Sequence, residues 1–295
     1  MKNILVTGAT GNIGKEVIYY LNTLENNSRI IAAVRDISKA KTTFATSQDI
    51  SYRTFDFKDK STFIKALHAV DILFLLRPPE ISEVNKYFKP LLEAAKKANI
   101  TKIVFLSVQG VERSKAIPHH KIEILIKNLD FEFIFIRPSY FMQNLTTTLL
   151  SEIKSKQKIT LPSGKAKFNW VDVKNIGEAA AVLINDFSVY KNQALEITGS
   201  ENLNFYEVTK LIDEEAGIPI LYNSVNPIKF YFVKRKEGIP SEFIIVMLLL
   251  HFLPRFQKEP KISNWYKKLT SKTPTKLATF IKREKESFLP LSITN

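Results

Sequence analysis

The sequence predicts an α/β fold with a doubly wound parallel sheet, followed by a smaller and mostly helical C-terminal region. Two observations support this prediction. Short runs rich in Ile, Val and Phe recur as far as residue 199, and they are almost continuously apolar, as strands buried on both faces are. Helical patterns separate these runs, and repeated strand–helix–strand units with right-handed crossovers build such a sheet. The expected strands are 2–8, 29–35, 50–57, 71–77, 101–108, 132–139 and 194–199.

The domain organisation follows from where this rhythm changes. Residues 1–150 are predicted to form the sheet domain, to which a further strand and helix return at about 168–200. Residues 151–295 are mostly helical in pattern and are interrupted by prolines, which favours a smaller substrate-side region. The expected helices are 14–24, 61–68, 83–99, 121–129, 175–186 and 201–217.

The composition excludes several classes of site. The chain of 295 residues contains no cysteine, which excludes disulfides, thiolate metal sites and cysteine nucleophiles. Its four histidines lack the i, i+4 spacing of a helical zinc site, so we expect no metal. The N-terminal MKNILVTGATG enters a strand directly, and the longest apolar run, 243–253, is shorter than the roughly 20 residues that span a bilayer. A cytoplasmic protein without membrane association is therefore expected.

The formal charge of +14 raises nucleic acid as a partner. The excess of lysine is spread along the chain, and abundant Asn, Ile and Lys together are typical of an AT-rich genome. A specific nucleic-acid role is therefore disfavoured, and a small-molecule ligand is the expected partner.

A glycine-rich segment, TGATGNIG at 7–14, follows the first expected strand and opens the first helix. Small residues let the backbone approach a pyrophosphate, whose charge is stabilised by the free N–H groups of a helix N-terminus. The segment therefore predicts a dinucleotide site and makes the sheet domain a Rossmann fold. The expected contacts in this loop are Gly8, Thr10, Gly11, Asn12, Ile13 and Gly14.

The end of the second strand distinguishes the two nicotinamide dinucleotides. An acidic residue there holds the ribose 2′-OH of NAD, whereas an arginine accommodates the 2′-phosphate of NADP. The chain reads AAVRDISKAK, with Arg35 before Asp36 and with Lys39 close by. A guanidinium binds phosphate through paired hydrogen bonds, so NADP(H) is preferred over NAD(H). Asp36 keeps NAD(H) as the alternative.

Together with this loop and VRD, later segments resemble the NmrA-like family, an atypical branch of the short-chain dehydrogenases/reductases. The resemblance implies a Rossmann fold that binds NAD(P). In function the family is mixed: it includes reductases of quinones and other small electrophiles, and redox-sensing regulators that control a partner protein. The segments that carry the resemblance are FLLRPPEIS (74–82), KIVFLSVQGVE (102–112), IPHHKIEILIK (117–127), IRPSYFMQNL (136–145), FNWVDVKNIGEAAA (168–181) and LEITGSENLNFYEV (195–208).

The resemblance also implies cofactor contacts at the ends of strands three to six. These positions lie near the adenine, the nicotinamide ribose, the nicotinamide and its carboxamide, in that order along the chain. Ordinary loop packing is the alternative at each of them. They are Asp56 and Phe57, then Leu76, Arg77 and Pro78, then Ser107 and Val108, and last Pro138, Ser139 and Phe141.

The catalytic Tyr-x-x-x-Lys of ordinary superfamily members is missing. Counting back from Arg137 puts the Lys position on His119 and the Tyr position on Lys115, which is no phenol. His119 is expected to hold a ribose hydroxyl and is the candidate proton donor, because an imidazole titrates near neutrality. An exposed histidine at a helix start is the alternative. The one Tyr-x-x-x-Lys present, Tyr206 to Lys210, follows the seventh strand and is interpreted as chance spacing.

Loss of the tyrosine disfavours ordinary alcohol–ketone interconversion. A quinone can accept hydride and take its proton from water, which needs mainly proximity and a dry pocket. Tyr140, Phe141 and Asn144 offer aromatic walls and a polar group to such a flat substrate, although Phe141 is equally well interpreted as core.

The sequence therefore favours an NADP(H)-dependent reductase of a small electrophile such as a quinone, acting as a monomer or homodimer. The alternative is a non-catalytic NAD(P)-binding redox sensor that acts through a protein partner. Turnover of NADPH separates the two hypotheses.

Overall fold

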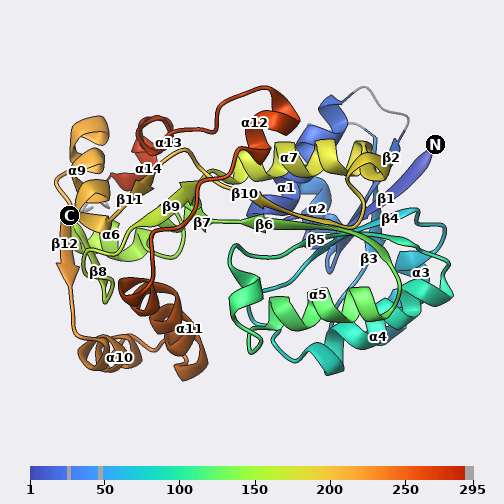
Figure 1. The fold of residues 1–295 in the computed structure, drawn as a ribbon, viewed down its shortest axis with the longest axis horizontal. Helices are drawn as coiled ribbons and strands as arrows, with labels where there is room; N and C mark the ends of the chain where they lie inside the picture. Colours follow the sequence, from blue (N-terminus) through green and yellow to red (C-terminus); the bar gives the residue numbers. More distant parts are fainter. Residues whose placement is uncertain (25–27, 46–48, 290–295) are drawn as a thin grey trace. The chain divides into compact units, whose positions relative to one another are not determined.

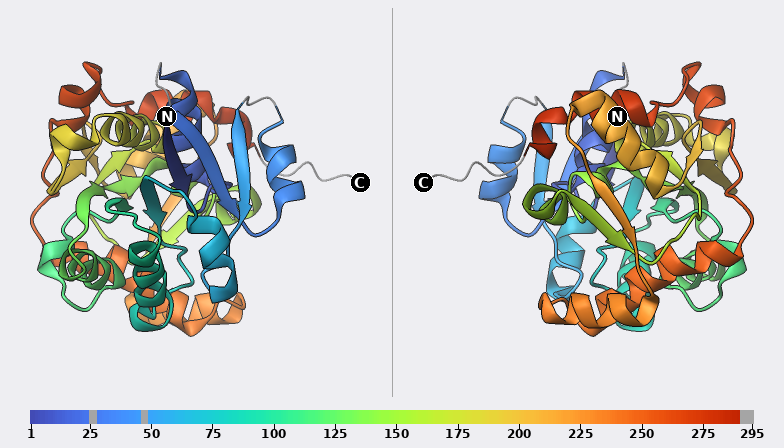
Figure 2. Two further views of the ribbon diagram at one scale, coloured as in Figure 1. Left: turned by 90° about the vertical axis from the view of Figure 1, so that its right-hand side faces the viewer. Right: turned by 90° about the vertical axis from the view of Figure 1, so that its left-hand side faces the viewer.

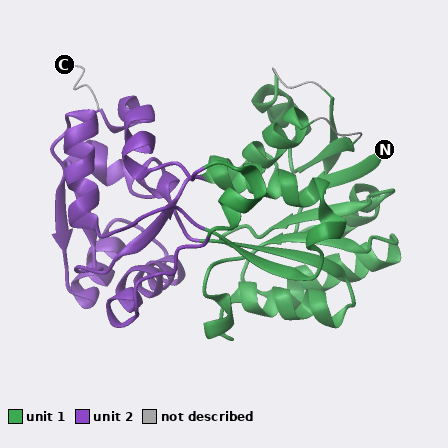
Figure 3. Cartoon of the chain, turned by 45° about the horizontal axis from the view of Figure 1, so that its top comes forward, with its two compact units in different colours: residues 1–138, 173–197, 264–272 green, residues 139–172, 198–263, 273–295 purple. Residues whose placement is uncertain are grey.

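The computed structural model describes residues 1–24, 28–45 and 49–289 of the chain. The chain forms two compact units, which are coloured separately in Figure 3. Unit 1 comprises residues 1–138, 173–197 and 264–272, and unit 2 comprises 139–172, 198–263 and 273–295. Residue 150, where the sequence predicts the division, is the first residue of a helix in unit 2.

A seven-stranded sheet forms the centre of unit 1 (Figure 1). Its order is β10-β6-β5-β4-β1-β2-β3, and every neighbouring pair is parallel. The predicted doubly wound sheet is confirmed, and its strand order reverses between β1 and β4, where such folds bind ligands. The strands are β1 (Lys2–Val6), β2 (Ser28–Val34), β3 (Ile50–Thr54), β4 (Ile72–Leu76), β5 (Lys102–Leu106), β6 (Glu132–Pro138) and β10 (Gln193–Ile197).

Helices cover both faces of this sheet, as Figure 1 and Figure 2 show. The helices α3, α4 and α5 pack on one face through a core that includes Phe63, Phe88, Leu91 and Ile122. On the other face α1 and α7 lie side by side, and a methyl group added to Gly177 of α7 would come within 2.5 Å of Glu16 Cβ in α1. The helices of unit 1 are α1 (Asn12–Thr23), α2 (Ile37–Thr43), α3 (Phe63–Leu67), α4 (Val84–Lys97), α5 (Pro118–Asn128), α7 (Val173–Asn185), α8 (Phe187–Tyr190) and α12 (Trp265–Thr270), with the 3₁₀ turns η1 (Lys60–Thr62) and η2 (Val111–Arg113).

Unit 2 combines helices with two small sheets. One sheet has the order β11-β9-β7 and the other pairs β12 with β8. A core around Trp170, Phe205 and Phe280, all buried, joins these strands to the helices. The elements are β7 (Tyr140–Phe141), β8 (Lys158–Leu161), β9 (Phe168–Val171), β11 (Asn202–Leu203), β12 (Leu221–Ser224), α6 (Leu150–Lys156), α9 (Phe205–Ala216), α10 (Pro227–Lys236), α11 (Ser241–Phe252), α13 (Leu277–Arg283) and α14 (Lys285–Phe288), with η3 (Met142–Leu145) and η4 (Leu253–Phe256).

Within the described ranges, no helix is long and apolar enough to cross a membrane. The apolar run 243–253 forms most of α11, which buries Ile244, Met247 and His251 and exposes its other face.

Candidate functional site

The glycine loop makes a turn between β1 and α1 that larger residues would block. Gly8 has a positive φ of 61°, and its carbonyl accepts a hydrogen bond from the Gly11 N–H at 2.9 Å. A Cβ on Gly14 would lie 2.2 Å from the Gly8 carbonyl oxygen. No side chain caps α1 at Gly11, so no capping side chain satisfies the N–H groups of its first turn, which lack intrahelical partners. This is the geometry that accommodates an anion.

The loop also meets the end of β4. A Cβ on Gly8 would lie 3.1 Å from Leu76 Cδ2, and the Leu76 N–H donates to Thr7 Oγ1 at 2.8 Å. The structure therefore brings two of the predicted cofactor segments together, on either side of the point where the strand order reverses.

The charged residues after β2 differ in how they are engaged. Asp36 caps α2 by accepting a hydrogen bond from the Lys39 N–H at 3.1 Å, and its carboxylate lies 4.0 Å from Lys39 Nζ. Arg35 is exposed and makes no hydrogen bond or ion pair with any residue that the structure describes. The guanidinium is thus available to an external anion, while the carboxylate already serves the helix.

The side chains of the two predicted adenine contacts mainly hold the protein's own structure together. Phe57 is 5% exposed and packs on Phe55 and Phe88. The Asp56 carboxylate accepts from the Lys58 N–H at 2.9 Å and so shapes the turn after β3. The Phe57 side chain is thus part of the core, whereas Asp56 is only partly buried.

At the end of β5, beside β6, one buried polar atom has no hydrogen-bond partner. Ser107 is 1% exposed, its N–H donates to the Ile136 carbonyl at 2.7 Å, and its Oγ has no hydrogen-bond partner. Among the described residues, it is the one buried side-chain nitrogen or oxygen atom that has no hydrogen-bond partner. A buried hydroxyl is normally paired, so an unpaired one at the carboxyl end of an inner strand points to a missing partner. Val108 and Pro138 lie beside it and shape the loops, since their carbonyls accept backbone hydrogen bonds.

Arg77 and His119 form the polar pair of this region. Arg77 Nε donates to His119 Nε2 at 3.3 Å, and Arg77 Nη1 donates to the carbonyls of Pro78, Pro79 and Ile81. Burial, and then the charge of Arg77, lower the pKa of His119 to about 3. His119 is therefore neutral near pH 7, whereas the sequence predicts an imidazole that titrates near neutrality.

Helix α5, which carries His119, is held by a buried ion pair. Arg137 donates to both carboxylate oxygens of Glu123, at 3.0 and 2.7 Å, and to Glu112 at 3.2 Å. Sequence reasoning missed this clamp, although an acidic residue four positions after His119 and an arginine on the next strand were visible. It fixes α5 to β6 and to the loop before the helix.

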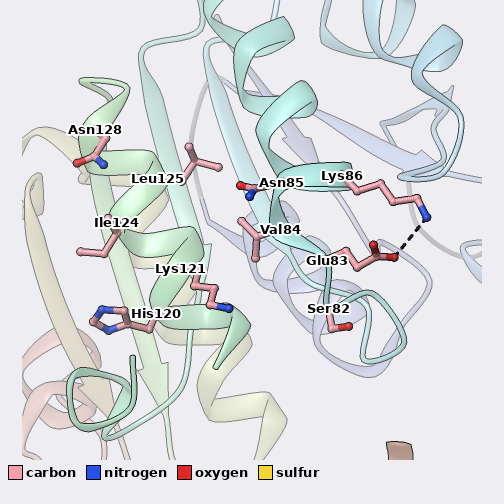
Figure 4. A pocket seen from close by; sticks show the side chains of 10 residues that line it. All are labelled: Ser82, Glu83, Val84, Asn85, Lys86, His120, Lys121, Ile124, Leu125 and Asn128. Carbon is pink, nitrogen blue, oxygen red and sulfur yellow. Dashed lines mark hydrogen bonds and ion pairs between the residues drawn. The ribbon is translucent and has the colours of Figure 1, made fainter. Parts of the chain in front are cut away.

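A groove of about 740 Å³ runs between the start of α4 and α5 (Figure 4). None of the predicted cofactor residues lines it. Lys121 and His120 line this groove from α5, and Lys86 pairs with Glu83 at 3.3 Å on the opposite rim, at the start of α4.

The remaining predicted residues belong to unit 2. Ser139 donates to Asn169 Oδ1 at 2.7 Å and so links β7 to β9.

Tyr140 forms a polar pair with His251. Tyr140 Oη lies 2.9 Å from His251 Nε2, and His251 Nδ1 donates to the Met247 carbonyl at 2.8 Å. Phe141 and Asn144 are partly buried in the same segment. His251 was missed from the sequence, where a single histidine inside an apolar run was the available signal.

Burial controls the ionisation of this second pair. It lowers the pKa of His251 to about 4 and raises the pKa of Tyr140. Both groups are therefore neutral near pH 7, with the phenol donating to the imidazole.

The comparisons with known proteins cover nearly the whole chain. Residues 1–280 match the NmrA-like family. The chain is 29% identical to prestalk A differentiation protein A of Dictyostelium discoideum over 95% of this chain and 91% of that protein. It is 27% identical to the NAD(P)H azoreductase of Xenophilus azovorans over 97% and 99% of the two chains.

Among solved structures, the chain is similar to the NADPH-dependent quinone oxidoreductase of Escherichia coli complexed with NADPH. The TM-score is 0.81 at 21% identity, and the match covers 95% of this chain and 99% of that one. At this identity the similarity concerns the fold.

Proposed function

The chain belongs to the NmrA-like family, and from this premise we propose that it is an NADPH-dependent reductase that transfers hydride to a small electrophile such as a quinone. The observation that carries the proposal is the uncapped start of α1 behind a turn in which a Cβ on Gly14 would lie 2.2 Å from the Gly8 carbonyl. A turn that admits only glycine beside free helix N–H groups is suited to a pyrophosphate.

The other residues at this edge of unit 1 fit the rest of a dinucleotide. Arg35 is an exposed guanidinium with no described partner, and Lys39 follows four residues later in the chain, which favours a 2′-phosphate. Ser107 offers a buried hydroxyl that lacks a partner. NADPH, when bound, supplies the hydride. The relatives named for NAD(P)H azoreductase and NADPH-dependent quinone oxidoreductase activity support this assignment.

The protonation states of His119 and Arg77 restrict the class of electrophile that can accept the hydride. His119 is neutral, so it is a poor acid, and Arg77 is a guanidinium that keeps its protons. A quinone accepts the hydride to become a hydroquinone anion, which then takes one proton from water. The fixed charge of Arg77 favours an acceptor that gains negative charge. A simple ketone, whose alkoxide needs a proton in the transition state, is disfavoured.

The test is consumption of NADPH with a panel of quinones, azo dyes and aldehydes. We expect turnover with quinones or azo dyes and none with aldehydes. Tight binding of NADPH without turnover of any acceptor would overturn the enzymatic proposal and favour a redox sensor that acts through a protein partner.

The cofactor preference has its own test in Arg35→Ala. Loss of a guanidinium that binds the 2′-phosphate should weaken NADPH binding about tenfold and leave NADH binding nearly unchanged. Arg29, at the other end of β2, donates to Ser51 Oγ at 2.9 Å, so Arg29→Ala is a matched control expected to affect neither cofactor. Equal losses for NADPH and NADH in Arg35→Ala would contradict the phosphate assignment.

A further inference from the structure

The hydrogen bond between Arg77 and His119 determines which imidazole nitrogen carries hydrogen. Arg77 Nε is a donor and has no acceptor capacity, so His119 Nε2 must present its lone pair at the 3.3 Å contact. A neutral imidazole with a lone pair on Nε2 carries its hydrogen on Nδ1. His119 Nδ1 makes no hydrogen bond with any residue in the described part of the chain. Its N–H is therefore a donor without a protein acceptor.

Both members of the pair are held in place. The Arg77 guanidinium is fixed by three carbonyls of its own loop, at 2.8 to 3.0 Å. His119 sits in the first turn of α5, which Glu123 ties to Arg137. The ring of Phe105 lies beside the imidazole, with centroids 6.1 Å apart and planes at 31°. The direction of the Nδ1–H group is thus set before any ligand arrives, which lowers the entropy cost of binding.

We propose that Arg77 is a positioning residue that holds His119 as the neutral Nδ1–H tautomer, and that this N–H donates to a hydroxyl oxygen of the bound dinucleotide. The proposal rests on the proposed function, because it takes the ligand to be NADPH. This positioning role is distinct from the direct cofactor contact expected from the sequence, because Arg77 Nε and Nη1 already donate to groups of the protein.

The charges around the ring agree with this assignment. Burial and Arg77 lower the pKa of His119. Burial also lowers the pKa of Arg77, and Glu80 acts in the opposite direction. Glu123 faces Arg137 rather than the imidazole. The donor is therefore maintained across the neutral range, and the contribution of this hydrogen bond to ligand binding should not depend on pH between about 5 and 8.

The first test is the imidazole ¹⁵N NMR spectrum of the whole protein without cofactor, with His119→Gln used for assignment. We expect the Nδ1–H pattern for His119 and no titration between about pH 5 and 8. Arg77→Met should raise the pKa of His119 and mix the tautomers. Arg53 donates to the carbonyls of Ala66 and His68, so Arg53→Met is a control that removes a loop-bracing arginine without touching His119. A wild-type Nε2–H pattern, or an unchanged spectrum in Arg77→Met, would overturn the proposal.

The second test uses two amides that place their N–H groups differently. The Asn side chain puts its N–H near the Nδ1 position and Gln near the Nε2 position. We expect His119→Asn to retain NADPH affinity within about threefold and His119→Gln to lose about tenfold. The opposite order would overturn the proposal. Failure of the wild-type protein to bind NADPH would refute the proposed function instead, while the NMR spectrum would still report the tautomer.

Discussion

Among the site residues, Ser107 gives the most specific prediction for stability and for NADPH binding. A buried donor without a partner costs about 1–3 kcal/mol, and Ser107 Oγ is such a group in the absence of ligand. We expect Ser107→Ala to leave the free protein as stable as wild type or up to about 1 kcal/mol more stable. The same change should weaken NADPH binding about tenfold, because the ligand loses a hydrogen bond. Urea unfolding and cofactor titration measure the two effects.

Ser163 provides the matched control for this prediction. It is 0% exposed, but its Oγ lies 2.8 Å from Tyr222 Oη in unit 2. Ser163→Ala should therefore destabilise the protein by about 1–2 kcal/mol and leave NADPH binding intact. If Ser107→Ala destabilised the free protein as much as Ser163→Ala does, Ser107 would have a protein partner and the argument would fail.

At this scale the sequence predicts local chemistry but not distant partners. The glycine loop and Arg35 could be identified from the sequence because the evidence for each lies in adjacent residues of the chain. The contact of Arg77 with His119 joins residues 42 positions apart, and Ser107, whose Oγ has no partner, is bonded through its N–H to Ile136 of β6. Neither could follow from residue spacing. Their roles in binding stay predictions.

Among the elements, α11 is the one whose stability should depend on pH. Its His251 is 3% exposed and bonded to Tyr140 and the Met247 carbonyl. Burial lowers the pKa of His251 from an ordinary 6.5 to about 4. The unfolded state therefore binds a proton between these values that the folded state does not. Stability is lost as pH falls through this window and is independent of this group above about pH 6.5.

The expected loss is about 2–3 kcal/mol in the free energy of unfolding between about pH 7 and pH 4.5. His119, whose pKa is about 3, adds to the same trend. His251→Gln should reduce the pH dependence, whatever it does to the stability at pH 7, whereas His68→Gln, at an exposed position, should not. Urea unfolding at the two pH values measures this. An unchanged pH dependence in His251→Gln would show that the imidazole is accessible to protons in the folded state.

Elements with long, continuous apolar patterns were predicted well. All seven expected strands overlap the seven strands of the sheet, and their ends differ by a few residues. The strands of unit 2 were not predicted as a set, because they are two to four residues long and pair across the sequence, as β8 does with β12. Short strands of this kind are stabilised by tertiary contacts, which a local pattern does not contain.

At the scale of the whole molecule, the chain passes between the units after residues 138, 172, 197, 263 and 272. Unit 1 is therefore completed by segments that come late in the sequence. Strand β10 pairs with β6 at the edge of the sheet, and α7 packs along α1. The sequence predicts a return at about 168–200. It does not predict the segment 264–272, which carries Tyr266, a residue bonded to Asn175 and Glu178 of α7.

Because later segments complete unit 1, we predict that residues 1–150 alone do not form a stable cofactor-binding domain. The fragment would expose the face of α1 that α7 covers and the edge of β6, and lose the buried α7 residues Ile176, Ala180 and Leu183. Exposing buried apolar surface costs about 25 cal/mol per Å², and domains are stable by only about 5–15 kcal/mol, so we expect the loss of these contacts to unfold the fragment. We expect the fragment to lack a cooperative thermal transition and to bind NADPH at least tenfold more weakly. Mixing it with residues 151–295 should restore both properties, because the missing strand and helices are then supplied in trans. Cooperative melting and full NADPH affinity of the fragment alone would show that β10 and α7 are dispensable to unit 1.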